Sequence, residues 1–481
     1  NCDWSSDVCS SDLCVTTDGI FHANDANGNN LACLPPPPPP CVNSDGREDS
    51  TFGNPCDAAT GEKREQESDH TSAAGPALSR YYSSQYSGNA GNGFGVGWMS
   101  SLGDKRLYVK SASVLAMRPG GKSETFTCPR TGTCAGAPDA AFIVSKSSGV
   151  YTLIRRDGGK EHYGASGLLL EEFDPAGRRT GYSYDNLRRL IQIIGPFGHA
   201  LTLTYTNGNQ VASVTDAAGE NLHYSYDDIR NLARVDYPDG SAKLYHYEDV
   251  TFPHHLTGIS YVNSTGTVSR YATFAYDVNG KAISTEHAGG VEEFTFSYDF
   301  DTQTTVTDAA GTQEVMTFAE TLGVKNLLSR INQSDGKGAT QVFDAQNNLL
   351  SHTDDEGRTT TYTYNADNQR VSMTEAAGTP EARITTYAYL SPDLDLPTLV
   401  ANPSVAPGQQ KQIATIYDNQ HNPLTIAQSG FTPSGVAVSR TISFQYNAAG
   451  QVIQIDGPRN DVSDITTLEY YDACTSAGEC G

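Results

Sequence analysis

Apolar and aromatic residues alternate with polar ones in short runs over most of this chain, and the alternation restarts about every 21 residues. Leu222, Tyr224 and Tyr226 alternate with His223 and Ser225, so the three larger side chains share one face of a strand. A turn and a second short strand come next, and a Pro-Asp-Gly sequence then signals another turn. Each unit is therefore predicted to contain two short antiparallel strands and two turns.

One aromatic position recurs in every unit, and we call it the anchor. The predicted anchors are Tyr163, Tyr184, Tyr205, Tyr226, Tyr247, Tyr276, Tyr298, Tyr364, Tyr389, Tyr417, Tyr446 and Tyr471, with Phe318 and Phe343 in two degenerate copies. A fixed period near 20 residues indicates stacked supersecondary units with one continuous core. We expect each ring to pack on the neighbouring unit. Because no long stretch has an apolar period of 3.6 residues, the pattern predicts an all-β fold with little helix.

The repeating motif resembles that of a known family. The order Tyr-Asp, turn, Asn-Leu or Arg-Leu, then Asp-x-x-Gly resembles the YD repeat of bacterial RHS-repeat proteins, with Asp-x-x-Gly at 216–219, 308–311 and 354–357. This resemblance covers roughly residues 150–481. Upstream, the short sequences at 53–55, 59–63, 79–82 and 95–98 resemble the segment that precedes the repeats in RHS proteins.

The resemblance implies a spiral, shell-like antiparallel β-sheet, as in RHS proteins and the similar teneurins and insecticidal toxin-complex subunits. It implies a non-enzymatic wall that encloses or displays a C-terminal effector of the same polypeptide, as in polymorphic toxin carriers. A secreted or cell-surface location would follow. The alternative is a cell-surface carbohydrate-binding or adhesin repeat protein, whose partners would be glycans.

Four stretches are predicted along the chain. Residues 1–13 resemble the translation of a sequencing adapter, and residues 14–50 form a Pro- and Asn-rich disordered linker. Residues 51–148 form a β-rich segment, and residues 149–481 form the repeat array, truncated at its C-terminal end. We therefore expect an internal fragment of a longer product, derived from environmental sequencing.

The charge of the chain limits its partners. The 481 residues carry a net charge of −24, which would repel nucleic acid and anionic membranes. Solubility alone explains such a charge. No apolar run approaches the roughly 20 residues needed to span a bilayer.

The ten cysteines include two pairs of identical spacing, Cys128 with Cys134 and Cys474 with Cys480. Disulfides across these turns would suit an oxidising destination. A zinc site is the alternative, although its ligand pairs usually lie two to four residues apart. Six prolines hold Cys33 and Cys41 too far apart to bridge each other. The pairing of five other cysteines stays open: Cys2, Cys14, Cys33, Cys41 and Cys56.

Three short motifs resemble ligand-binding loops, and each departs from its pattern. Residues 116–123 fit a relaxed phosphate loop, but a strand is predicted after them where a helix is required. Residues 25–29 resemble the start of a calcium loop, with Asn30 and Pro36 where glycine and glutamate belong. The His254–His255 pair could bind a metal, but it lies in a predicted loop beside a proline.

Catalytic motifs are equally weak. No G-x-S-x-G or H-E-x-x-H sequence occurs. Carboxylates are plentiful, but they occupy turn positions, and none forms a distinguishable glycosidase pair. The Asp-Pro-Ala-Gly at 174–177 resembles part of the cleavage segment of toxin-releasing RHS proteins, yet its place before most repeats favours an ordinary turn. We therefore predict no catalytic, metal-binding or cofactor-binding residue.

Overall fold

The computed structural model describes residues 49–72, 75–86, 93–110, 112–118, 123–448, 450–459, 461 and 463–470, together with the strands β1 (Cys14–Val15), β2 (Phe21–Asn24) and β3 (Asn30–Ala32). Residues 1–50 and residues 51–481 are separate compact units. In the first unit, β1, β2 and β3 pair antiparallel as a small sheet. The predicted adapter-derived stretch 1–13 lies outside the described residues.

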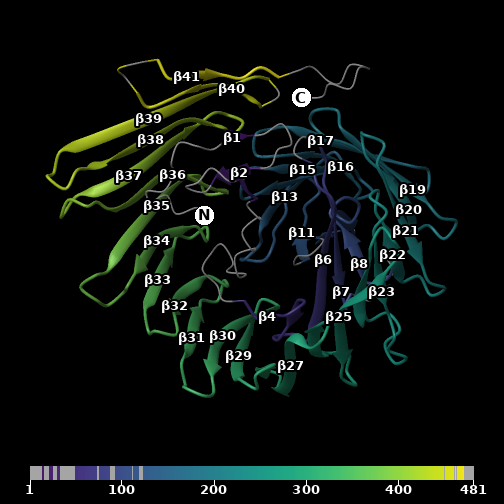
Figure 1. Ribbon diagram of the computed structural model, residues 1–481. Helices are drawn as coiled ribbons and strands as arrows, with labels where there is room; N and C mark the ends of the chain where they lie inside the picture. The colour runs from purple at the N-terminus through teal and green to yellow at the C-terminus, as the bar shows by residue number, and fades with distance from the viewer. Residues whose placement is uncertain are drawn as a thin grey trace. The chain divides into compact units, whose positions relative to one another are not determined.

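One antiparallel sheet of 30 strands dominates the second unit (Figure 1). Its strands, from β12 to β41, pair in the order in which they occur in the sequence. The first half consists of β12 (Gly132–Thr133), β13 (Phe142–Ser147), β14 (Val150–Arg155), β15 (Lys160–Tyr163), β16 (Leu169–Phe173), β17 (Arg179–Tyr184), β18 (Leu190–Ile194), β19 (Ala200–Tyr205), β20 (Val211–Thr215), β21 (Asn221–Tyr226), β22 (Leu232–Asp236), β23 (Ala242–His246), β24 (Gly258–Val262), β25 (Val268–Tyr276) and β26 (Ala282–His287).

The second half of the same sheet contains the longer hairpins. It consists of β27 (Val291–Phe300), β28 (Gln303–Asp308), β29 (Gln313–Thr321), β30 (Val324–Asn332), β31 (Gly338–Phe343), β32 (Leu349–Thr353), β33 (Thr359–Tyr364), β34 (Arg370–Glu375), β35 (Arg383–Ser391), β36 (Leu394–Pro403), β37 (Gln410–Tyr417), β38 (Pro423–Phe431), β39 (Ala437–Tyr446), β40 (Val452–Asp456) and β41 (Ile465–Thr467). No helix occurs among the described residues, so the predicted all-β fold is confirmed.

Two smaller sheets precede the large one. One contains β4 (Thr51–Phe52), β5 (Cys56–Asp57), β6 (Glu62–His70), β7 (Leu78–Ser83) and β8 (Trp98–Ser100), and the other contains β9 (Arg106–Val109), β10 (Ser113–Met117) and β11 (Glu124–Thr127). Strands β6, β7 and β8 lie on the inner side of the curved large sheet (Figure 1). We call residues 51–109 the lining segment.

The lining segment completes the hydrophobic core. Leu78, Tyr82 and Trp98 pack among buried residues of β18 to β25, including Ile193 and Tyr224. A second cluster joins the start of the lining segment to β26–β30, and a third joins β9–β11 to β13–β16. These repeats therefore bury their apolar faces against residues of the two smaller sheets. A single-layer sheet needs such a covering layer to be stable.

The large sheet curves until its later turns contact its own beginning. Four hydrogen bonds link residues 208 to 236 positions apart in the sequence, from the turns around β13–β15 to the turns around β31–β36. We call this contact zone the seam. Among the described residues, no helix could serve as a membrane span.

Candidate functional site

The anchor tyrosines fix one repeat to the preceding one through their hydroxyl groups. Tyr184 ends β17 at a β-bulge, and its hydroxyl donates to the carbonyl oxygen of Leu169, 2.8 Å away. Tyr205, one repeat later, likewise ends a strand at a bulge and donates to the carbonyl of Leu190 at 2.7 Å. Because the acceptor lies 15 residues earlier in both cases, each bond ties consecutive hairpins together.

The same contact recurs along the array. The other anchors that donate to a backbone carbonyl are Tyr226 (to Val211), Tyr276 (to Leu256), Tyr298 (to Ala282), Tyr364 (to Leu349), Tyr389 (to Arg370), Tyr417 (to Pro397) and Tyr446 (to Pro423). Phe318 and Phe343 occupy bulges but lack the hydroxyl. Burial raises the pKa of the Tyr184 and Tyr205 phenols, so these hydroxyls stay protonated and can donate.

Two predicted anchors are placed differently, and a third is not described. The Tyr163 hydroxyl donates to Glu161 at 2.6 Å inside a buried group with Arg118. The Tyr247 hydroxyl accepts a bond from the Trp98 indole at 3.0 Å. Tyr471 lies outside the described residues, but the neighbouring Tyr470 donates to the carbonyl of Val452 at 2.9 Å, as an anchor does.

Turn aspartates, several of which directly follow an anchor, close the turns of the repeats. The Asp185 carboxylate accepts the backbone N–H groups of Leu187 and Arg189, both at 2.9 Å. Asp308, at the opposite end of the strands, accepts those of Ala310 and Thr312 at 2.9 and 2.8 Å. These N–H groups lower the pKa of both carboxyls. The abundant carboxylates of the repeats therefore hold turns.

A buried ionic network attaches the lining segment to the repeats. The Arg80 guanidinium on β7 is fully buried, pairs with Asp69 and donates to the Tyr245 hydroxyl at 3.0 Å. It lies 4.6 Å from the centre of the Trp98 ring. Tyr224 in turn donates to Asp69 at 2.9 Å. The arginine thus binds two elements that are distant in sequence, and its partners neutralise its charge.

Further bonds extend this contact. Tyr245 donates to Glu67 at 3.0 Å, and Lys243 forms an ion pair with the same carboxylate. The Tyr82 hydroxyl donates to the carbonyl of His254 at 2.9 Å and accepts from the N–H of Leu256 at 2.8 Å. We call these residues, with Arg80 and Trp98, the junction. The sequence carries no signal for it, because its partners come from segments over 130 residues apart.

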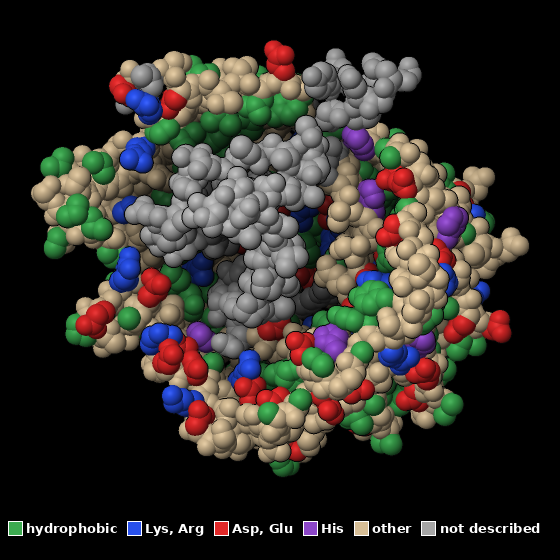
Figure 2. Space-filling model, in the orientation of Figure 1, with side chains coloured by type: hydrophobic (Ala, Val, Ile, Leu, Met, Phe, Trp, Pro, Cys, Tyr) green, Lys and Arg blue, Asp and Glu red, His purple; other side chains and the backbone are tan. Residues whose placement is uncertain are grey.

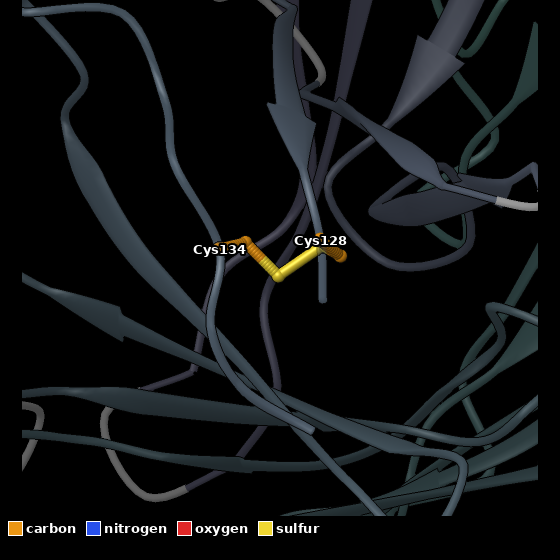
Figure 3. Close-up of a disulfide and its surroundings, with 2 residues drawn as sticks. All are labelled: Cys128 and Cys134. Carbon is orange, nitrogen blue, oxygen red and sulfur yellow. A yellow bond between two sulfur atoms is a disulfide. The ribbon is translucent and has the colours of Figure 1, made fainter. Parts of the chain in front are cut away.

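The cysteines occupy two environments. Cys128 and Cys134 are joined by a disulfide with a Cα–Cα distance of 4.2 Å (Figure 3). Cys56 is a buried thiol whose pKa burial raises to about 12, so it is unreactive. Cys474 and Cys480 lie outside the described residues, as do the side chains of Cys2, Cys14, Cys33 and Cys41.

The motifs that resemble metal and phosphate sites have structural roles where they are described. His254 bonds to Asn231 at 2.7 Å, and His255 stacks on Phe252 with ring centres 4.7 Å apart. The strand β11 follows residues 116–123, where a phosphate loop would require a helix. The calcium-like residues 25–29 are not among those described.

On the face in Figure 2, acidic and basic side chains are intermixed.

One cluster of acidic side chains places three carboxylates close together. Asp354, Asp355 and Glu356 are close enough to share a metal ion, the only such group found in the described part of the chain. The Asp354 carboxylate already accepts the N–H of Arg358 at 2.9 Å and pairs with its guanidinium at 2.7 Å. This group is part of an exposed Asp-x-x-Gly turn.

The chain resembles several solved structures and two family models. A mutant Tc holotoxin pore from Photorhabdus luminescens is 10% identical, with a TM-score of 0.45, and the match covers 86% of this chain and 27% of that one. A crystal structure of TcdB2-TccC3-TEV is also 10% identical, with a TM-score of 0.38 and coverages of 92% and 28%. The chain thus spans less than a third of these solved chains. No curated protein of similar sequence was found.

The family models match both parts of the large unit. The RHS repeat matches residues 163–200, 205–242 and 343–380, and the domain of unknown function DUF6531 matches residues 53–126. The three repeat matches start at Tyr163, Tyr205 and Phe343, which are positions of the tyrosine pattern. The chain therefore contains RHS repeats, and they follow a DUF6531 segment.

Proposed function

We propose that this chain forms the non-enzymatic wall of an RHS-type shell, which encloses or displays a C-terminal effector segment of the same polypeptide, as in a polymorphic toxin carrier. The observation that carries the proposal is the seam, where the sheet returns to contact its own beginning. A flat or open array of the same repeats would have no such contact and could not separate an inside from an outside.

Specific side chains form the seam. The Asn368 amide donates to the carbonyl of Pro138 at 2.7 Å, and the Asn347 amide donates to Asp139 at 2.8 Å. The Arg156 guanidinium donates to the carbonyl of Asp367 at 3.1 Å. Asn347 and Asn368 both have positive φ, 63° and 60°, a conformation that asparagine tolerates better than most residues. The turns are thus shaped to meet the earlier strands.

The partly exposed apolar surface of the later strands is further evidence for an enclosed segment. Ile426, Ile442, Phe444 and Ile455 share one face by strand register, and all four are only half-buried. The earlier repeats bury their corresponding side chains under the lining segment. An enclosed segment resting on β38–β40 would remove this apolar surface from water, which stabilises the contact.

Enclosure should protect the enclosed segment from proteases. In the polypeptide extended along its gene, a protease site placed after the repeats should resist cleavage while the wall is folded. The double substitution Asn347→Ala and Asn368→Ala should open the seam and speed cleavage. Gln346→Ala, in the same turn but outside the seam, should not. Equal cleavage rates with an intact and an opened seam would contradict enclosure.

The wall is also proposed to act without chemistry of its own, because the carboxylates of its turns are held by backbone N–H groups. Assays of the 481-residue chain with nucleic acid, NAD, peptides and glycans should show no turnover. Reproducible turnover that is lost on thermal unfolding would overturn this part of the proposal.

A secreted or cell-surface location belongs to the same proposal. The disulfide between Cys128 and Cys134 supports it, since disulfides persist in oxidising compartments. No specific observation favours glycan binding by the anchor tyrosines, whose hydroxyls donate to backbone carbonyls. A glycan array with the purified chain would test that alternative directly.

A further inference from the structure

A cavity of about 490 Å³ lies where the lining segment crosses the turns of the early repeats. Phe94, Asp104 and Arg106 border it from the lining segment, and Arg188, Arg189 and Arg230 border it from the turns. It lies apart from the seam and the junction. Four guanidinium groups around one cavity are unusual in a chain with a net charge of −24. We call it the arginine cavity.

Two of these arginines occupy a conformation in which glycine is usual. Arg188 and Arg230 are the third residue after the turn aspartate, with φ values of 62° and 74°. Gly280 and Gly450 fill the same turn position in other repeats, at φ of 77° and 76°. Arginine is strained there, so its presence needs an explanation beyond the turn itself.

The charges around the cavity do not cancel. Arg189 pairs with Asp185 at 2.7 Å and donates to Asn209 at 3.0 Å. Asp104, the one carboxylate lining the cavity, accepts the N–H of Ser100 at 2.6 Å. Two carboxylates therefore accompany four guanidinium groups, which leaves an excess of positive charge at the cavity.

Arg188 and Arg230 supply the excess charge. Both are exposed, and neither side chain forms a hydrogen bond or ion pair within the described part of the chain. They belong to turns two repeats apart, with the Asn209 turn between them, and all three turn positions border the cavity. Their side-chain donors are therefore available to a ligand.

We propose that the arginine cavity binds a small oxyanion, a phosphate or carboxylate group, with Arg188 and Arg230 as its main ligands. The planar guanidinium donates two parallel hydrogen bonds to such groups, which a single ammonium cannot do. A cavity of this size accommodates a small molecule. The Tyr184 and Tyr205 hydroxyls on its wall already donate to carbonyls, so recognition falls to the arginines.

Equilibrium dialysis of the 481-residue chain tests this proposal, with radiolabelled inorganic phosphate in one arm and citrate in the other, both at constant ionic strength. Saturable binding of either anion supports the proposal, and the preferred arm identifies its chemistry. Arg188→Gly with Arg230→Gly should weaken binding roughly tenfold or more, as expected for lost charge-assisted hydrogen bonds. Glycine suits the positive φ, so this variant should keep its fold.

The matched control is Arg383→Gln with Arg440→Gln. These exposed arginines lie on β35 and β39, away from the cavity lining, and their loss changes the net charge equally. The control should bind as the wild type does. Absence of saturable binding by the wild type at millimolar anion, or equal weakening in the control, would overturn the proposal.

Discussion

At the scale of single residues, the repeat depends on one tyrosine hydroxyl and one turn aspartate. The sequence shows the tyrosine as a periodic aromatic and suggests a packing role. The structure adds that its hydroxyl satisfies a backbone carbonyl of the preceding hairpin at a β-bulge, where the regular ladder is interrupted. This explains why tyrosine recurs where phenylalanine would give similar apolar burial.

Tyr226 provides the test of this role. Tyr226→Phe removes the bonds to the carbonyls of Val211 and Gly93, at 2.8 and 3.0 Å, and leaves the ring in place. We expect a loss of about 1 kcal/mol of unfolding free energy, against about 3 kcal/mol for Tyr226→Ala. Denaturant unfolding measures both. Tyr261→Phe, on a ring that is 39% exposed, should change little. An unchanged midpoint for Tyr226→Ala would show that the ring does not carry the packing.

A substitution at Gly219 measures the effect of backbone conformation on stability without a change in packing. Its φ is +88°, and a Cβ added there would meet no atom within 4 Å. Gly219→Ala should therefore cost about 1 kcal/mol through backbone strain alone. Ala218→Gly in the same turn, where φ is not positive, is the control and should not reproduce the effect. Equal stability of Gly219→Ala and the wild type would show that this turn can relax.

At the scale of elements, the hairpins are predictable because their determinants are local. Alternation defines each strand, and the aspartate and glycine define each turn, all within about 21 residues. The registers confirm antiparallel pairing of every strand of the large sheet with its sequence neighbour. The bulges are not readable from alternation, because an extra residue at a strand end leaves the pattern of the other residues unchanged.

The turn carboxylates give the hairpins a defined acid sensitivity. The hydrogen bond from the N–H of Thr312 lowers the pKa of the Asp308 carboxyl in the folded protein. The charged Asp308 therefore stabilises the fold fully above its unfolded-state pKa of about 3.9, and this stabilisation is lost as the pH falls through the lower folded-state pKa. Asp308→Asn should narrow the stability difference between about pH 7 and about pH 3. Thermal melts across this range measure it. An unchanged difference would mean that the turn N–H groups do not favour the charged form.

At the scale of the whole molecule, the lining segment and the seam join a row of hairpins into one folded unit. Neither can be predicted from the repeat pattern. Arg80 reads in the sequence as one polar residue on a short strand, and only the fold surrounds it with Asp69, Tyr224 and Tyr245. Cys128 and Cys134, by contrast, lie six positions apart in the sequence, so their disulfide could be predicted from their spacing alone.

The junction should be essential to this arrangement. Arg80→Met leaves Asp69 buried without its main partner and should cost about 3–5 kcal/mol, measured by urea unfolding. Adding Asp69→Asn should recover part of this loss, because the uncompensated charge is removed. Arg459→Met, in an ion pair with Asp461 in which both side chains are more than half exposed, should cost less than about 1 kcal/mol. Equal effects of both arginine substitutions would contradict the role of the buried network.

The order of residues along the chain is enough to predict the repeat, its two strands and two turns, the all-β class and the family resemblance. Those features depend on alternation and turn chemistry among residues close together in the chain. The curvature of the sheet, the position of its seam, the residues that the lining segment covers and the meeting of four arginines at one cavity all depend on long-range contacts. Such contacts join residues up to 266 positions apart, and they depend on small twists accumulated over many strands, which no local pattern records.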